Sequence, residues 1–160
     1  EVVLVLSNNP GALVLERAKN LGVQNLVFTK QQLNDSKWAN ENLKDLDLVV
    51  LAGFLWKLPD HILESYKNKV VNVHPALLPK YGGKGMYGMR VHQAVVENNE
   101  SESGITIHYV NEHYDEGAVI FQAKCTISPT DTPNDVAAKI HQLEMKYFPE
   151  AVQQILYPHG

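Results

Sequence analysis

Cysteine is almost absent from this sequence. Cys125 is the single cysteine among 160 residues, so no disulfide can close within the chain and no multi-cysteine metal site can form. A reducing compartment suits such a chain, and we expect a cytoplasmic protein. Spacings typical of metal ligands are also missing among five of the histidines, His61, His92, His113, His141 and His159. We therefore predict no metal.

Long apolar runs and blocks of positive charge are lacking as well. No apolar run approaches the roughly 20 residues that a membrane-spanning helix needs, and the N-terminus shows no basic segment followed by an apolar one. The net charge is −4 with neutral histidines, and no Lys/Arg-rich block offers the phosphate contacts of sequence-independent nucleic-acid binding. We expect small-molecule substrates, no nucleic-acid or membrane partner, and a monomer or homodimer.

The chain does contain alternating strand and helix patterns. With 44% hydrophobic residues it has the size and apolar content of one domain, which we expect to span residues 1–160. Short apolar runs predict strands at 1–7, 25–28, 48–52, 70–73, 104–110 and 118–123. Helices are predicted at 12–22, 60–66, 91–97 and from 131 onward, with a weak helix in the polar stretch up to Asp45.

The last two predicted strands differ from the others in their connection. The stretch NEHYDEG between them is too short for a helical crossover and implies an antiparallel pair. Asp131, Thr132 and Pro133 mark the start of the last helix. Its apolar stripe runs through Val136, Ile140, Leu143, Tyr147 and Val152. We predict a three-layer α/β fold with a mostly parallel sheet, antiparallel C-terminal strands and a long C-terminal helix.

Polar residues stand at the end of the 70–73 strand, where ligands collect in such sheets. Asn72 and His74 are two residues apart, so an extended backbone puts both side chains on one face. An Asn amide donates to a developing oxyanion, and a His gives or takes a proton near neutral pH. Asp115 would complete an acid catalyst, because a nearby carboxylate raises the pKa of a histidine. Taken singly, such residues are more often turn formers or hydrogen-bonded structural residues.

His108 and a glycine-rich segment fit structural roles better than catalytic or phosphate-binding ones. His108 alternates with Ile105 and Ile107 along its strand and therefore faces away from them, as a structural histidine or one that supports the site would. The segment from Tyr81 to Gly85 is glycine-rich and holds a lysine, but it lacks the strand-to-helix spacing of a phosphate loop. We interpret it as a mobile flap.

Three strings in the sequence point to a family. LAGFLWKLP, VVNVHPALLPKYGGKGMYGMRVHQAV and GITIHYVNEHYDEGAVIFQ, in this order, closely resemble the phosphoribosylglycinamide formyltransferases (GAR transformylases) among the folate-dependent formyltransferases. The resemblance covers nearly the whole chain. It implies a Rossmann-like formyltransferase fold and transfer of a formyl group from the cosubstrate 10-formyltetrahydrofolate to glycinamide ribonucleotide in purine (IMP) biosynthesis. Asn72, His74 and Asp115 match the family's catalytic residues.

The resemblance also implies binding residues for both substrates. On the folate side these are Leu55, Trp56, Lys57, Leu58, Asn72, Asn111, Glu112, His113, Tyr114 and Asp115. On the nucleotide side they are Pro75, His141 and Glu144. Ordinary core, loop and exposed helix positions are the structural alternatives for these residues.

One part of the family's pattern is missing from these residues. The family opens with a strand, a Gly/Ser/Asn-rich loop and a helix, and backbone N–H groups of that loop hold the substrate phosphate. EVVLVLSNNPGALVLERA instead matches the second strand and helix, so about 30 residues of the pattern are absent. We favour a fragment over a protein that has lost its phosphate site, because a missing central strand would expose apolar sheet edges.

Other functions stay open at this point. A formyltetrahydrofolate hydrolase would share the polar triplet and pass the formyl group to water. A methionyl-tRNA formyltransferase is disfavoured, because no basic extension follows Gly160. A folate-binding protein without catalysis would result if the phosphate loop were truly lost. A purely structural domain would leave the triplet unexplained.

Overall fold

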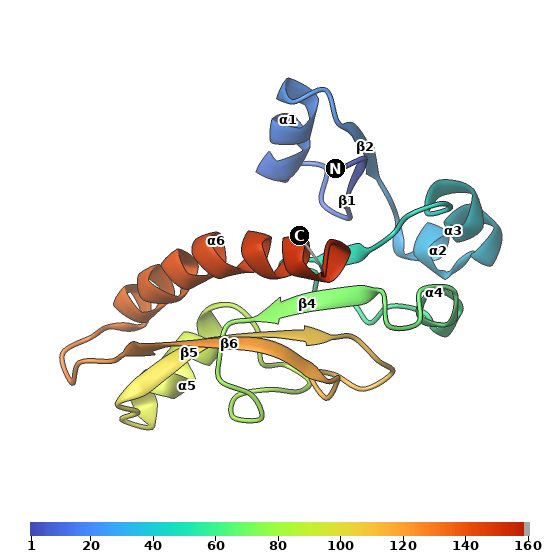
Figure 1. The fold of residues 1–160 in the computed structure, drawn as a ribbon. Helices are drawn as coiled ribbons and strands as arrows, with labels where there is room; N and C mark the ends of the chain where they lie inside the picture. The colour runs from blue at the N-terminus through green and yellow to red at the C-terminus, as the bar shows by residue number, and fades with distance from the viewer. Residues whose placement is uncertain (159–160) are drawn as a thin grey trace. The chain divides into compact units, whose positions relative to one another are not determined.

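The computed structural model describes residues 1–158, so His159, one of the histidines predicted not to bind metal, lies outside them. The chain forms two compact units, Glu1–Asp45 and Leu46–Gly160, and the single domain expected from the sequence stays a prediction. Figure 1 shows the ribbon of both, and each unit is described here by itself. Within residues 1–158, no helix combines the length and apolarity needed to cross a bilayer.

The first unit contains one strand–helix–strand unit followed by two short helices. Its elements are β1 (Leu4–Ser7), α1 (Leu13–Asn20), β2 (Gln24–Val27), α2 (Lys30–Asn34) and α3 (Ser36–Asn42). β1 and β2 are parallel, with Leu4 opposite Gln24. Gly22 follows α1 at φ +70°, the left-handed conformation that a helix C-terminus favours and that only glycine adopts cheaply. The glycine therefore ends α1 as the sequence predicts.

The polar stretch after β2 forms two helices, where the sequence predicts one. Thr29 caps α2 in a reciprocal arrangement with Gln32. Asp35 then takes an extended conformation (φ −88°, ψ 110°), which ends α2, and its carboxylate accepts from the backbone N–H of Lys37 and Trp38 at the start of α3. One aspartate thus terminates one helix and begins the next, a feature that average helix propensity does not reveal.

The second unit holds a four-stranded mixed sheet. Its elements are β3 (Val49–Leu51), α4 (Asp60–Ser65), β4 (Val70–His74), α5 (Met89–Glu97), β5 (Glu102–Tyr109), β6 (Val119–Thr126) and α6 (Pro133–Leu156). The strand order is β3-β4-β5-β6. β3 is parallel to β4, whereas β4–β5 and β5–β6 are antiparallel. The predicted fold class, with antiparallel C-terminal strands and a long last helix, is confirmed.

The core of this unit lies between one face of the sheet and helices α5 and α6. Ile105 and Ile107 on β5 are fully buried and pack with Val95 of α5 and Ile140 of α6. Figure 1 shows α6 (red) running along this sheet. Four members of the predicted α6 stripe are buried or packed on the core, but Ala151 takes the place of Val152 at its C-terminal end. Each fully buried Ile or Val contributes roughly 1.5–3 kcal/mol to folding.

Candidate active site

The strand register places four polar side chains on the sheet face opposite the α5–α6 core. Asn72 of β4 lies opposite His108 of β5, and His74 lies opposite Thr106. His74 is 3% exposed, His108 2% and Thr106 0%. Buried polar groups are costly unless they are hydrogen-bonded, so the partners of these side chains define the site.

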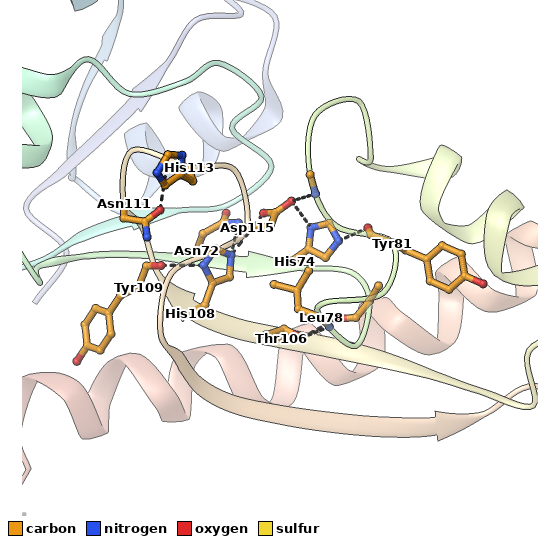
Figure 2. Close-up of polar contacts among 12 residues, drawn as sticks. Asn72, His74, Leu78, Tyr81, Thr106, His108, Tyr109, Asn111, His113 and Asp115 are labelled. Atoms are coloured by element: carbon orange, nitrogen blue, oxygen red, sulfur yellow. Dashed lines mark hydrogen bonds and ion pairs between the residues drawn. The ribbon is translucent and has the colours of Figure 1, made fainter.

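Asp115 reaches this face from the loop between β5 and β6 (Figure 2). The loop is closed by a hydrogen bond from the Tyr109 N–H to the Ala118 carbonyl, 2.9 Å. Gly117 allows that closure, because a Cβ at this residue would lie 1.7 Å from the Tyr109 carbonyl oxygen. Asp115 itself has φ +57°, a left-handed conformation that aspartate tolerates better than most residues.

The Asp115 carboxylate contacts three groups. Its Oδ2 lies 3.5 Å from Nδ1 of His74 and its Oδ1 lies 3.6 Å from Nε2 of His108. Oδ2 also accepts a hydrogen bond from the Gly83 N–H, 2.9 Å. Burial by itself raises the pKa of Asp115, but the two histidines and the Gly83 N–H outweigh burial and lower that pKa overall. The carboxylate is therefore held ionised between two imidazole rings.

The orientation of His74 is set by the backbone. Its Nε2 lies 2.7 Å from the carbonyl oxygen of Tyr81. A carbonyl only accepts, so Nε2 carries a proton and Nδ1 is the nitrogen that faces Asp115. The sequence predicts that Asp115 raises the pKa of His74, and Asp115 does raise it, but the pKa is lowered overall. Burial lowers the pKa of His74, and Asp115 and the Tyr81 carbonyl offset that only in part.

His108 supports Asn72. Its Nδ1 lies 2.8 Å from the Tyr109 carbonyl and must donate to it, so Nε2 is an acceptor whenever the ring carries a single proton. Nε2 lies 3.2 Å from Nδ2 of Asn72, which donates to it. The bond uses one N–H of the Asn72 amide and leaves the other for a ligand. The sequence predicts a structural or supporting role for His108, and its hydrogen bond to Asn72 matches the supporting one.

Thr106 and Gln122 extend the network, and sequence reasoning missed both. The Thr106 hydroxyl donates to the Ala76 carbonyl, 2.7 Å, and accepts from the Leu78 N–H, 3.0 Å. It also accepts from the Gln122 amide, 2.9 Å, which reaches the Leu78 carbonyl as well, 3.1 Å. These bonds hold the segment that follows His74. The signal was available for Thr106, because it shares the His108 face of β5.

The remaining predicted binding residues lie outside this cluster of contacts. Leu55 is exposed and Leu58 is buried, and both follow β3. In the β5–β6 loop, Asn111 accepts from the His113 N–H, 2.9 Å, which forms a local turn. His141 and Glu144 lie on α6 and pair with each other at 3.7 Å. Burial raises the pKa of Glu144, and His141 partly opposes that rise.

The other predicted folate-side and nucleotide-side residues have these settings. Lys57 pairs with Asp60 at 3.9 Å, and the Trp56 ring meets the Phe54 ring edge-on. Glu112 and Tyr114 are exposed, and Pro75 directly follows His74 on the chain. In the part of the chain that the structure describes, no group of three or more His, Cys, Asp or Glu side chains could hold a metal ion.

Known proteins are similar to this chain in sequence. A family model described as formyl transferase matches residues 1–152. A chloroplastic phosphoribosylglycinamide formyltransferase of Arabidopsis thaliana is 37% identical over 97% of this chain, which spans 56% of that protein. A phosphoribosylglycinamide formyltransferase of Haemophilus influenzae is 32% identical over 96% of this chain and 73% of its own length. The chain spans 12% of a trifunctional purine biosynthetic protein of Drosophila melanogaster, at 38% identity.

Solved structures agree with the sequence comparison. The crystal structure of phosphoribosylglycinamide formyltransferase from Bacillus halodurans matches with a TM-score of 0.85 and 30% identity, covering 98% of this chain and 81% of that one. The enzyme of the same name from Streptococcus pneumoniae matches with a TM-score of 0.82 and 32% identity, over 96% and 86% of the two chains.

Proposed function

The chain belongs to the formyl transferase family, with phosphoribosylglycinamide formyltransferases as its relatives, and on that premise we propose that it moves a formyl group from 10-formyltetrahydrofolate to the amine of glycinamide ribonucleotide. The observation that carries the proposal is the cluster of Asn72, His74 and Asp115, with one amide donor, one imidazole and one ionised carboxylate on a single sheet face. An oxyanion donor and a positioned proton carrier both accelerate formyl transfer through a tetrahedral intermediate, and this cluster offers both.

In the proposed reaction the substrate amine attacks the formyl carbon, and the carbonyl oxygen becomes an oxyanion. The second N–H of the Asn72 amide donates to that oxygen, and the protonated His74 ring stabilises its charge. Because the pKa of free His74 is lowered by burial, the oxyanion itself must favour the imidazolium form as charge develops. The Asp115 carboxylate also favours the imidazolium form of His74. Asp115 then helps carry the proton from the attacking amine to the folate nitrogen, as the bond between that nitrogen and the formyl carbon breaks.

Binding of the two substrates is part of the same proposal. Leu55–Leu58 and Asn111–Asp115 would line the folate pocket, largely through backbone groups and apolar side chains. Pro75, His141 and Glu144 would face the nucleotide. No metal is required, since the proton carriers and oxyanion donors are protein groups. We also propose a cytoplasmic location and a monomeric or homodimeric state.

The acceptor decides between transfer and hydrolysis. Purified protein of its full natural length is incubated with 10-formyltetrahydrofolate, with and without glycinamide ribonucleotide, and the products are identified by mass spectrometry. We expect formylglycinamide ribonucleotide to form when the acceptor is present, and little turnover without it. Rapid release of formate in the absence of acceptor would instead make the protein a formyltetrahydrofolate hydrolase, and folate binding without either product would make it a binding protein.

A further inference from the structure

Tyr81 has a backbone conformation that is unusual for its side chain. It lies in the segment between β4 and α5, with φ +56°. In this left-handed region the Cβ of a bulky residue crowds the backbone, so the surroundings must hold the residue there. The result is that the Tyr81 carbonyl oxygen points at His74 and accepts from Nε2 at 2.7 Å (Figure 2).

The Tyr81 side chain is held at its far end. The phenol hydroxyl donates to Oε1 of Glu100 at 2.9 Å. Burial and the neighbouring carboxylate raise the pKa of Tyr81 to about 12, so the hydroxyl keeps its proton and stays a donor at neutral pH. The ring itself packs against the core formed by β5, α5 and α6. Both ends of the side chain thus restrain the backbone from which the carbonyl projects.

Glu100 is well placed to act as a fixed point. It lies in the short turn between α5 and β5, and its own N–H donates to the Val95 carbonyl at 3.2 Å. Lys80 also contacts the Glu100 carboxylate, with Nζ 2.9 and 3.1 Å from its two oxygens. The Lys80 side chain is largely exposed, however, and exposed ion pairs contribute little. The hydroxyl–carboxylate bond is the contact that connects Tyr81 to the α5–β5 turn.

We propose that Tyr81 and Glu100 are positioning residues, which hold the Tyr81 carbonyl against Nε2 of His74 and thereby leave Nδ1 as the ring nitrogen that exchanges protons. Neither residue touches the reacting atoms; both act through His74. The tautomer of His74 follows from the geometry alone, whereas its consequence for turnover rests on the proposed formyl transfer.

The chemical consequence is a choice between two tautomers. With the carbonyl in place, the neutral ring carries its proton on Nε2, and the Nδ1 lone pair is free to accept a proton next to Asp115. If the carbonyl moves away, a proton on Nδ1 can donate to the Asp115 carboxylate instead, and the neutral ring changes to that tautomer. His74 would also lose one of the two contacts that raise its pKa.

Four variants test this placement. Tyr81→Phe removes only the hydroxyl and keeps the ring in the core. Glu100→Ala removes the acceptor, whereas Glu100→Gln keeps an amide oxygen that can accept from Tyr81. Lys80→Met is the matched control, because it removes the exposed ion pair and leaves the hydroxyl–carboxylate bond. Two-bond ¹H–¹⁵N correlation spectra of the histidine rings report the tautomer and the pKa of His74 without any substrate.

We expect Tyr81→Phe and Glu100→Ala to populate the Nδ1–H tautomer of His74, to lower its pKa, and to reduce kcat roughly tenfold with little change in KM, as loss of alignment does. Glu100→Gln and Lys80→Met should resemble the unchanged protein.

If Glu100→Ala fails to fold, the spectra of Tyr81→Phe test the proposal by themselves. An unchanged tautomer and pKa of His74 in Tyr81→Phe would overturn the proposal, as would a change of equal size in Lys80→Met. If the spectra change as expected but no variant, nor the unchanged protein, transfers a formyl group, the positioning role stands and the proposed function fails.

Discussion

At the scale of single residues, the site is defined by where its protons are. Both histidine rings are fixed by backbone carbonyls, His74 by that of Tyr81 and His108 by that of Tyr109. Because a carbonyl cannot donate, each contact specifies which ring nitrogen carries a proton. The arrangement leaves Nδ1 of His74 and one N–H of Asn72 for chemistry. Asp115 provides the negative charge next to both rings.

The charge of Asp115 is testable through His74. Asp115 raises the pKa of His74 against the effect of burial, so Asp115→Asn should lower that pKa further. The pH at which His74 loses its proton in an NMR titration should therefore move to a lower value than in the unchanged protein. Turnover at neutral pH should fall roughly a hundredfold or more, since less imidazolium forms and the proton carrier is lost.

The control for this variant is an exposed carboxylate elsewhere on the second unit. Asp47→Asn removes the same charge from the surface and should leave the His74 titration unchanged. A pKa of His74 that stays constant or rises in Asp115→Asn would show that the carboxylate does not govern this ring.

At the scale of elements, the β5–β6 loop determines where Asp115 stands. The register of the two strands shifts between Ile107 and His108, a β-bulge of the kind that redirects side chains next to functional sites. Gly117 then packs directly on the Tyr109 carbonyl. The bulge and the glycine together bring the loop back over β4, which is how a residue far along the chain reaches His74.

Gly117→Ala tests the role of this loop. The new methyl group would meet the Tyr109 carbonyl oxygen at 1.7 Å, so the loop must move. We expect the free energy of unfolding to fall by about 1–3 kcal/mol and formyl transfer to fall more than tenfold, because Asp115 shifts with the loop. Gly11→Ala is a suitable control, since its Cβ would make only an ordinary contact of 3.5 Å. Urea melts establish that Gly117→Ala is folded. A normal rate of formyl transfer by the folded variant would show that Gly117 is not needed to place Asp115.

Helix α5 carries a histidine that links stability to pH. His92 is 6% exposed, and its Nδ1 is buried with no hydrogen-bond partner among residues 1–158. Burial lowers the pKa of His92 below its ordinary 6.5. Below pH 6.5 His92 therefore binds a proton in the unfolded chain but not in the folded chain. The free energy of unfolding falls as the pH falls. The contribution is at most about 1.4 kcal/mol per pH unit.

Urea melts at several pH values measure this effect. His92→Leu should flatten the decline in the free energy of unfolding between pH 6.5 and 5, although His74, whose pKa is also lowered, contributes a slope of the same sign. His113→Gln, a change at an exposed side chain, should leave the slope as it is. A slope that is equally steep in His92→Leu would mean that His92 is not a source of the acid sensitivity.

Most elements of the fold follow from local patterns in the sequence. The strand at Val70–His74 and the antiparallel pair β5–β6 are where apolar runs and a short connection predict them. The division of the polar stretch into α2 and α3 was not predictable from periodicity, because it depends on one capping residue, Asp35. The shift from Val152 to Ala151 at the end of α6 depends on packing against the sheet, which the sequence pattern does not fix.

The site shows the same division between local and long-range information. The shared face of Asn72 and His74 follows from strand alternation alone. The approach of Asp115 depends on the bulge and on Gly117, which act across strands. The lowered pKa of His74 depends on burial, and burial is a property of the folded chain. The Tyr81 carbonyl contacts His74 through a backbone atom. Every residue has such an atom, so the residue type at position 81 does not predict this contact.

At the scale of the whole molecule, the strands form two sheets, β1-β2 and β3-β4-β5-β6, within the described residues. In this part of the chain β1 pairs only with β2, and β3 only with β4. Val2, Val3 and Val50, which lie on or just before these strands, are exposed. The proposed catalytic cluster lies entirely in the second unit, on β4, β5 and the β5–β6 loop.

The most direct test is the rate of formyl transfer from 10-formyltetrahydrofolate to glycinamide ribonucleotide, measured side by side for the unchanged full-length protein, Asn72→Ala and His74→Ala. Loss of an oxyanion donor or of a proton carrier typically costs a hundredfold, so each variant should turn over at least about a hundredfold more slowly while remaining folded by circular dichroism. A near-normal rate in both variants, or no acceptor-dependent product from the unchanged protein, would contradict the assignment of formyl transfer to this cluster.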